Sequence, residues 1–309
     1  MTSSSSFTLI LSFILTGLSA NQSYAQKELI SNPDRVSIHT EDIDLFWKVF
    51  DASQPKFSAD QFNKDYLEKG SDGLKGFIPM RIQSGKHLKK TVYKNLEYYK
   101  NIRSTTLAID GNKKILQGYF KKLKALYSPA VFPEIYFVIG AMNTGGTTFS
   151  GGLIIGAEMF GKANGNFSPR LPLEDMDLTV VHELIHYQQN YIHDQSLLAQ
   201  SIREGTADFF CELVTGKHLN EAMYRYGDQH EKDLWEEFQR KMTENNWSPW
   251  LYGNKDDSRP RDLGYWMGYK IVKSYYEHAA DKNQAIVDLL NISDFNKILS
   301  QSGYMGGAN

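Results

Sequence analysis

The sequence contains a single cysteine, Cys211, in 309 residues. One cysteine cannot form an intrachain disulfide, and it excludes a zinc site built from two or more cysteines. Its neighbours Phe209, Phe210 and Leu213 are apolar, so we expect a buried and unreactive thiol. Any zinc site in this chain therefore has to rely on histidine and carboxylate side chains.

The chain also lacks a strong excess of charge of either sign. Its 34 basic and 36 acidic side chains leave a formal net charge of −2, and no basic stripe with interleaved aromatics stands out. This balance gives no general attraction to nucleic acid or to an anionic membrane. With 41% hydrophobic residues, the chain has ample material for one large domain or two modest ones.

No apolar run is long enough for a comfortable transmembrane helix. The longest, residues 7–20, has instead the length of the apolar part of an export signal. Ser23-Tyr24-Ala25 places small residues at the positions before a cleavage site, so residues 1–25 are predicted to be removed before Gln26. Residues 1–6 carry no Lys or Arg, which leaves an uncleaved membrane anchor as the alternative. We expect an exported protein, periplasmic or secreted, with no membrane span after signal cleavage.

Residues 26–130 show helical patterns throughout. Thr40 or Asp42 can cap the first helix and Ser58 the next. Two longer helices are expected over residues 85–102 and 112–127. We therefore divide the chain into a signal peptide, an N-terminal helical region over 26–130 and a catalytic region over 131–309.

The pattern changes to β at residue 135. Residues 135–139 are rich in β-branched and aromatic side chains and predict a strand, and residues 153–159 predict a second. The Gly-rich stretch 143–152 between them is expected to be a flexible loop. It has no basic residue and no phosphate-binding pattern of the G-x-x-x-x-G-K-[ST] type, which argues against a nucleotide site.

The most specific motif is His182-Glu183-Leu184-Ile185-His186. On a helix, residues four apart lie on one face, so His182 and His186 can bind one metal ion while Glu183 reaches an activated water. The motif is short and can arise by chance. The alternative is a surface helix with two solvated histidines.

Glu204 on the following predicted helix is the candidate third metal ligand. It follows His186 by 18 residues, enough for one helix to finish, a turn and two turns of a second helix. The small residues Gly205 and Ala207 would allow these two helices to approach closely. Asp208, four residues after Glu204, could accept a hydrogen bond from the far nitrogen of a histidine ligand. A solvated helix face is again the alternative.

This arrangement resembles the gluzincin metallopeptidases. Those enzymes carry a His-Glu-x-x-His helix followed by a helix with a glutamate and, four residues later, an aspartate, which correspond here to His182, Glu183, His186, Glu204 and Asp208. The form Glu-Gly-x-Ala-Asp looks more like the predicted zinc-dependent proteases of the DUF2268 family, which is related to the GldB family of gliding-motility lipoproteins. Phe46-Trp47, residues 70–74 and residues 264–272 are similar in character to that group. The chain has no lipobox cysteine, so lipid anchoring is not carried over.

The resemblance implies a predominantly helical α+β fold, with a gluzincin-like core and a small sheet whose edge strand packs on the motif helix. It implies Zn2+ as the cofactor, Glu183 as general base and an edge strand that binds extended substrate, here Leu153, Ile154, Ile155 and Gly156. It also implies a Tyr or His that stabilises the oxyanion; Tyr265 is our choice, with His230 and Tyr269 as alternatives.

The main hypothesis is thus an exported zinc metallopeptidase acting on a peptide or protein. The competing hypothesis is a non-catalytic, gliding-related envelope scaffold with a metallopeptidase-like fold. The sequence assigns neither an oligomeric state nor a cleavage specificity.

Overall fold

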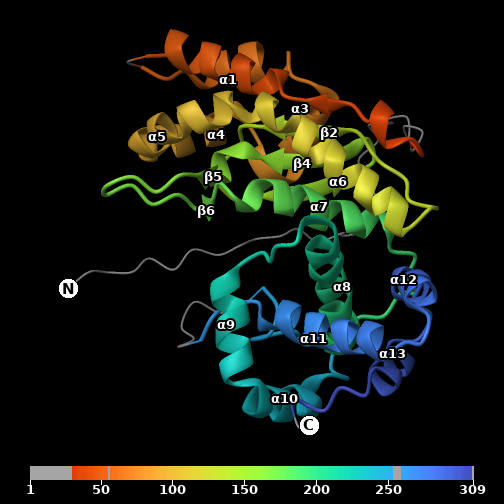
Figure 1. Ribbon diagram of the computed structural model, residues 1–309. Helices are drawn as coiled ribbons and strands as arrows, with labels where there is room; N and C mark the ends of the chain where they lie inside the picture. Colours follow the sequence, from red (N-terminus) through yellow and green to blue (C-terminus); the bar gives the residue numbers. More distant parts are fainter. Residues whose placement is uncertain (1–29, 55, 253–258, 308–309) are drawn as a thin grey trace. The chain divides into compact units, whose positions relative to one another are not determined.

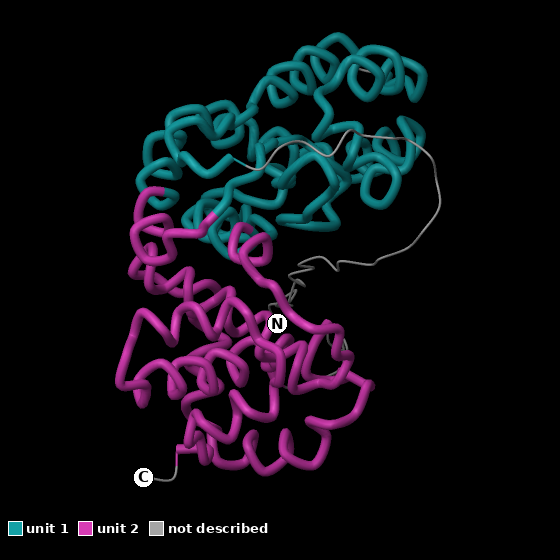
Figure 2. Tube along the Cα trace, turned by 90° about the vertical axis from the view of Figure 1, so that its right-hand side faces the viewer, with its two compact units in different colours: residues 1–120, 131–183 teal, residues 121–130, 184–309 magenta. Residues whose placement is uncertain are grey.

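The computed structural model describes residues 30–54, 56–252 and 259–307, and the predicted signal peptide lies outside them. Within this part of the chain, no helix combines the length and apolar character needed to cross a membrane. The chain forms two compact units, residues 1–120 with 131–183 and residues 121–130 with 184–309 (Figure 2). Helix α6 crosses the boundary after residue 120, and helix α7, which carries the His-Glu-x-x-His motif, crosses the boundary after residue 183.

The first unit combines short helices with small sheets (Figure 1). Its α-helices are α1 (Glu41–Ala52), α2 (Ala59–Gln61), α3 (Asp72–Phe77), α4 (Gly85–Lys94), α5 (Leu96–Leu107), and the larger parts of α6 (Lys113–Leu126) and α7 (Asp175–Gln188). Its strands are β1 (Ile38–His39), β2 (Ile135–Val138), β3 (Gly146–Phe149), β4 (Gly152–Gly156), β5 (Phe160–Gly161) and β6 (Leu171–Pro172). Short 3-10 and π-helical segments are η1 (Pro33–Arg35), η2 (Phe62–Leu67), η3 (Ile78–Ile82), η4 (Ile109–Asn112) and η5 (Ala157–Met159).

The main sheet shows that the prediction of an edge strand at residues 153–156 is wrong. Its strand order is β1-β2-β4-β3, with β2 parallel to β1 and β4, and β3 antiparallel to β4. The segment Leu153 to Gly156 therefore lies inside the sheet, because β4 pairs on both of its sides. The edge is β3, which occupies part of the expected loop 143–152. The β-branched pair Thr147 and Thr148 favours this strand, and Ser150-Gly151 form the turn into β4.

Two tyrosines from the N-terminal helical segments hold the end of β2. The Tyr66 hydroxyl donates to the carbonyl of Ile139 at 2.7 Å and accepts from its amide at 3.0 Å, while the Tyr99 hydroxyl donates to the carbonyl of Gly140 at 2.8 Å. Both rings pack on Phe46 of α1, in an aromatic core. Because the helices of residues 41–107 pack on the sheet in this way, the compact units do not follow the predicted division at residue 130.

The long helix predicted over residues 85–102 is interrupted at Asn95. Asn95 leaves helical geometry, with φ −119° and ψ 34°, so that α4 ends at Lys94 and α5 begins at Leu96. Its side-chain amide donates to the carbonyl of Thr91 at 2.8 Å, which satisfies an acceptor in the last turn of α4. This local competition for backbone groups is typical of asparagine and ends the helix.

The second unit is helical in the residues that the structure describes. Its helices are α8 (Leu197–Thr215), α9 (Glu221–Gln229), α10 (Glu231–Lys241), α11 (Leu263–His278), α12 (Lys282–Leu290) and α13 (Phe295–Ser302). The Ser196 hydroxyl caps α8 by accepting from the amide of Ala199 at 3.2 Å. Gly216 ends this helix in the left-handed conformation, with φ 77°, as the sequence predicts.

Helices α8 and α11 touch through their backbones (Figure 1). A Cβ added to Gly205 would lie 2.0 Å from the backbone nitrogen of Tyr269, and one added to Gly268 would lie 1.7 Å from the carbonyl oxygen of Ser201. The small residue Gly205 thus allows a close helix approach, but its partner is α11 and not the motif helix. Glycine is required here because backbone atoms occupy the space of any side chain.

Together the units form the predicted fold class, predominantly helical with small sheets. Residues 153–156 and the division at residue 130 are the two main departures from the predicted architecture.

Candidate metal centre

Helix α7 is buried over most of its surface. Leu178, Val181 and Ile185 are 3% exposed or less, and Val180 and Leu184 are buried too. Asp175 and Asp177 lie in its first turn, where negative charge interacts favourably with the helix dipole. Because the helix is buried over most of its surface, its polar motif residues are held in a low-dielectric setting.

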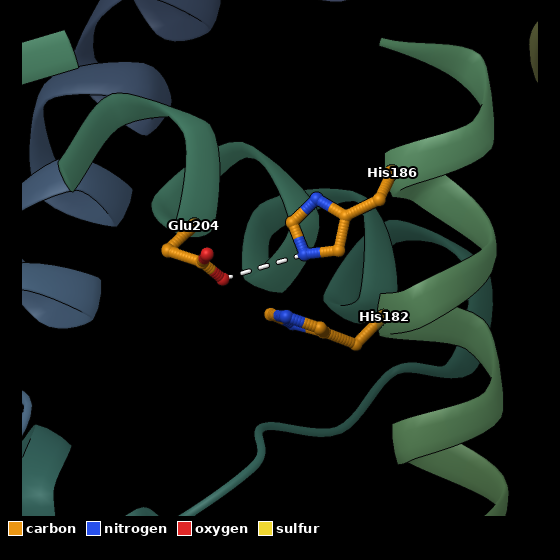
Figure 3. Close-up of side chains that lie close together, drawn as sticks. All are labelled: His182, His186 and Glu204. Carbon is orange, nitrogen blue, oxygen red and sulfur yellow. Dashed lines mark ion pairs between the residues drawn. The ribbon is translucent and has the colours of Figure 1, made fainter. Parts of the chain in front are cut away.

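The three candidate ligands lie together (Figure 3). One ligand atom from each of His182, His186 and Glu204 lies within 4.8 Å of the other two, and the three side chains point toward a common centre. Nε2 of His186 is 3.3 Å from Oε2 of Glu204. The histidines extend from adjacent turns of α7, and the carboxylate extends from α8.

Burial removes the alternative of solvated helix faces. His182 is fully buried, Glu204 is 6% exposed and Asp208 is 4% exposed. Buried ionisable groups of this kind need a charge partner, a hydrogen-bond network or a metal ion. The polar residues on these two helices thus form an interior cluster.

Gln189 determines which nitrogen of His186 carries a proton. Nε2 of Gln189 donates to the carbonyl of Arg203 at 2.7 Å, so its Oε1 faces Nδ1 of His186, at 2.9 Å. Because that oxygen can only accept, Nδ1 carries the hydrogen. In the neutral imidazole, the lone pair of Nε2 then faces the Glu204 carboxylate. A metal ion bound to both atoms would relieve the repulsion between these two electron-rich atoms.

The donor set is of a kind that can hold a metal ion such as zinc. Two imidazoles and one carboxylate form a ligand set known from catalytic zinc sites, with a fourth position left for water. Metal-ligand bonds of about 2.0–2.2 Å in a tetrahedron separate ligand atoms by about 3.3–3.5 Å. The distance between Nε2 of His186 and Oε2 of Glu204 falls in this range.

Asp208 lies close to the centre, and its Oδ2 accepts a hydrogen bond from the Tyr224 hydroxyl at 2.7 Å. The far nitrogen of His186, which the sequence also offered to Asp208, is instead held by Gln189. For His182, the role of Asp208 as hydrogen-bond acceptor stays a prediction.

The three candidate oxyanion donors differ in their surroundings and hydrogen-bond partners. Tyr265 is buried near Glu204, and burial, followed by the nearby carboxylates, raises its pKa well above the usual value. The hydroxyl of Tyr269 donates to Glu212 at 2.6 Å. His230 stacks on Tyr226 at the junction of α9 and α10. Of the three, Tyr265 is thus the one with an electrostatic link to the centre.

Glu183 faces the edge strand of the main sheet. A Cβ added to Gly146 would lie 2.8 Å from Cγ and 2.9 Å from Oε1 of Glu183, so β3 and the carboxylate approach closely. Arg81 also interacts electrostatically with Glu183, which partly offsets the lowering of the arginine pKa by burial. Asn143 holds the backbone at Arg81 by donating to its carbonyl at 2.8 Å.

Two residues next to the candidate ligands escaped the sequence prediction. Gln189 follows His186 by three positions on the chain, and this spacing was the available signal. Tyr252 donates from its hydroxyl to Oε1 of Glu204 at 3.3 Å. It lies outside any helix and 48 residues away along the chain, so no local pattern could identify it.

Comparison with known proteins places the chain in a family. The family model described as gliding motility protein GldB matches residues 25–306. Neither the curated proteins nor the solved structures include a match to this chain. The matched range includes all the candidate ligands and nearly all the described residues of both units.

Proposed function

The chain belongs to the family of gliding motility protein GldB, and from this premise we propose that it is an exported, gliding-related zinc metallopeptidase. The observation that carries the proposal is the convergence of His182, His186 and Glu204 on one buried centre (Figure 3). The relation to gliding follows from the family. The metal and the hydrolytic reaction rest on the side chains.

The three ligands would hold zinc by two imidazole nitrogens and one carboxylate oxygen. Zinc, when bound, supplies a Lewis acid that polarises a peptide carbonyl and lowers the pKa of a water molecule to about 7. Two histidines and one carboxylate also bind Fe(II) in non-haem iron enzymes, so the choice of zinc rests on the His-Glu-x-x-His pattern of the motif. Glu183, adjacent to His182 and buried, would take the proton of the attacking water and deliver it to the leaving amine.

Substrate binding is assigned to β3 in place of the interior strand β4. The antiparallel register pairs Thr147 with Ile154, and the backbone groups of Thr148 therefore point away from β4. An extended peptide can add to such an edge by backbone hydrogen bonds. The close approach of Gly146 to Glu183 puts this edge next to the proposed base. Tyr265 remains a proposed source of oxyanion stabilisation.

A second function is favoured by the family description itself. That description names gliding motility and no reaction, which supports a non-catalytic envelope scaffold. In a scaffold, the buried cluster would stabilise the junction of α7 and α8, with or without a metal ion. The two functions differ in what happens when Glu183 loses its charge.

The test measures bound zinc by elemental analysis and cleavage of a mixed peptide library. Wild type, Glu183→Gln and His186→Ala are compared, with His230→Ala as the control because this histidine is exposed and its ring pairs with the backbone of Tyr226. The metallopeptidase proposal expects one zinc per chain in wild type and Glu183→Gln, cleavage only in wild type and the control, and loss of zinc in His186→Ala.

Zinc without Glu183-dependent cleavage would instead support the scaffold. A wild-type protein that takes up no zinc would overturn the metal site.

A further inference from the structure

The two oxygens of the Glu204 carboxylate have different partners. Oε2 faces Nε2 of His186 at 3.3 Å, on the side of the candidate metal centre. Oε1 accepts a hydrogen bond from the hydroxyl of Tyr252, also at 3.3 Å. The carboxylate is therefore divided between a metal-facing oxygen and a tyrosine-facing oxygen.

Tyr252 is itself held from two sides. Its backbone amide donates to Oδ1 of Asp262 at 2.6 Å, and Asp262 is only 6% exposed. The hydroxyl of Tyr265, on α11, hydrogen-bonds to that of Tyr252. The order of donors is therefore Tyr265 to Tyr252 to Glu204.

Two residues of this arrangement have an uncommon backbone conformation. Tyr252 and Asp262 both adopt the left-handed conformation, with φ of 58° and 62°, which is uncommon for residues other than glycine. Such a residue persists only when its surroundings impose the conformation. The hydrogen bond from the Tyr252 amide to Asp262 joins the two residues that adopt it here.

A carboxylate can bind a metal ion through one oxygen or through two. Two-oxygen binding would add a fifth ligand to a site in which zinc otherwise has three protein ligands and one water. A hydroxyl that donates to one oxygen competes with the metal for that oxygen. We propose that Tyr252 is a positioning residue that keeps Glu204 bound through Oε2 alone, with Tyr265 orienting the Tyr252 hydroxyl. This inference rests on the proposed metal site and revises the part played by Tyr265.

Cobalt(II) provides the probe, because its visible absorption reports coordination number and weakens as ligands are added. The full-length protein is loaded with Co2+, and its spectrum is compared with those of Tyr252→Phe and Tyr265→Phe. Tyr269→Phe is the matched control, because its hydroxyl lies on the same helix as that of Tyr265 but donates to Glu212. The Co2+ affinity of each protein is measured by competition with a chelator.

In Tyr252→Phe, the visible absorption is expected to lose intensity severalfold, while the Co2+ affinity changes by less than about tenfold. Tyr265→Phe should shift the spectrum in the same direction but less, and it keeps the variant series informative if Tyr252→Phe folds poorly. Tyr269→Phe should match wild type.

Tyr252→Phe and Tyr265→Phe spectra that equal the wild-type spectrum would overturn the inference and leave the metal site standing. A wild-type protein that binds no Co2+ would overturn the proposed function, and this inference with it. The two failures are thus distinguishable.

Discussion

Two regions of this molecule hold their backbone in place by opposite means. In the second unit, α8 and α11 meet backbone to backbone at Gly205 and Gly268, one residue away from Glu204. In the first unit, the end of β2 is held by polar side chains, from Tyr66 and Tyr99 and from the buried carboxylate of Glu158. The contact between α8 and α11 depends on glycines, which have no side chain. The hydrogen bonds at the end of β2 depend on polar side chains, one of which, Glu158, changes its charge with pH.

The two regions are expected to respond differently to substitutions and to pH. Helix contact through glycine leaves no room for adjustment, because the neighbouring atoms belong to a backbone. A network of hydrogen bonds can lose one member at moderate cost, but it responds to pH when a carboxylate is part of it. Sequence changes are thus expected to have the larger effect at α8 and α11, and pH changes at the end of β2.

The largest effect is expected for Gly205→Ala. The added methyl would lie 2.1 Å from the backbone carbonyl carbon of Gly268, so α8 and α11 must separate. We expect a loss of at least about 3 kcal/mol in the free energy of unfolding, at the upper end for overpacking. Urea denaturation followed by circular dichroism measures it.

Gly118→Ala is the matched control for that change. Gly118 lies within α6, and a Cβ added there meets nothing within 4 Å. Alanine should therefore stabilise the protein by about 0.5–1 kcal/mol. Equal urea midpoints for the two variants would break the comparison between tight and open positions.

A smaller effect is expected for Glu158→Gln. The two oxygens of its carboxyl group accept from the amides of Gly140 at 2.8 Å and Met142 at 3.0 Å. The glutamine amide can accept only one of these bonds and turns its own N–H groups toward the other, which should cost about 2 kcal/mol. Thermal denaturation at pH 5 measures this, with the exposed residue change Glu97→Gln as control.

Glu158 also predicts a pH dependence. Burial raises its pKa from 4.5 to about 7. The folded state thus binds the proton more tightly than the unfolded state, so stability falls as pH rises from about 4.5 through 7. The contribution of this one group over that window is about 3 kcal/mol. Glu158→Gln should remove this slope, and a slope that survives in the variant would contradict the assignment.

The smallest effect is expected for Gln189→Leu. In the second unit, Gln189 positions His186 by a hydrogen bond. Leucine removes the acceptor for Nδ1 of His186 and the donor to the Arg203 carbonyl. Second-layer changes of this kind typically weaken metal binding by about 10–100-fold, and we expect the lower end, with little change in stability. Chelator competition measures the zinc affinity. Gln195→Leu, an exposed change, should leave it unaltered.

The candidate centre could be predicted from the sequence to the extent that its spacing is local. His182 and His186 are brought together by helix geometry alone, and Glu204 follows because the next helix returns to the same place. Gln189 could have been predicted in the same way, because it follows His186 by three positions on the chain. Tyr252 was not, because its approach to Glu204 depends on the turn at Asp262 and on α11, which lie far along the chain.

The order of strands in the main sheet could not be predicted from local sequence patterns. The strands predicted over residues 135–139 and 153–159 overlap β2 and β4, although residues 157–159 form the 3-10 segment η5. The order of the strands was not predicted. Which strand lies at the edge depends on pairing between segments, and composition says nothing of pairing. The substrate strand was therefore assigned to β4 when the edge is β3.

The sequence by itself determined the helical character of the chain, the motif on α7 and the candidate ligand set, because periodicity and spacing are properties of the local backbone. The tertiary structure decided how these residues are used. It buried His182 and Glu204, turned Gly205 toward α11 and placed Tyr252 against the second oxygen of Glu204. These outcomes depend on packing and hydrogen bonds between distant segments, whose energies no single stretch of sequence contains.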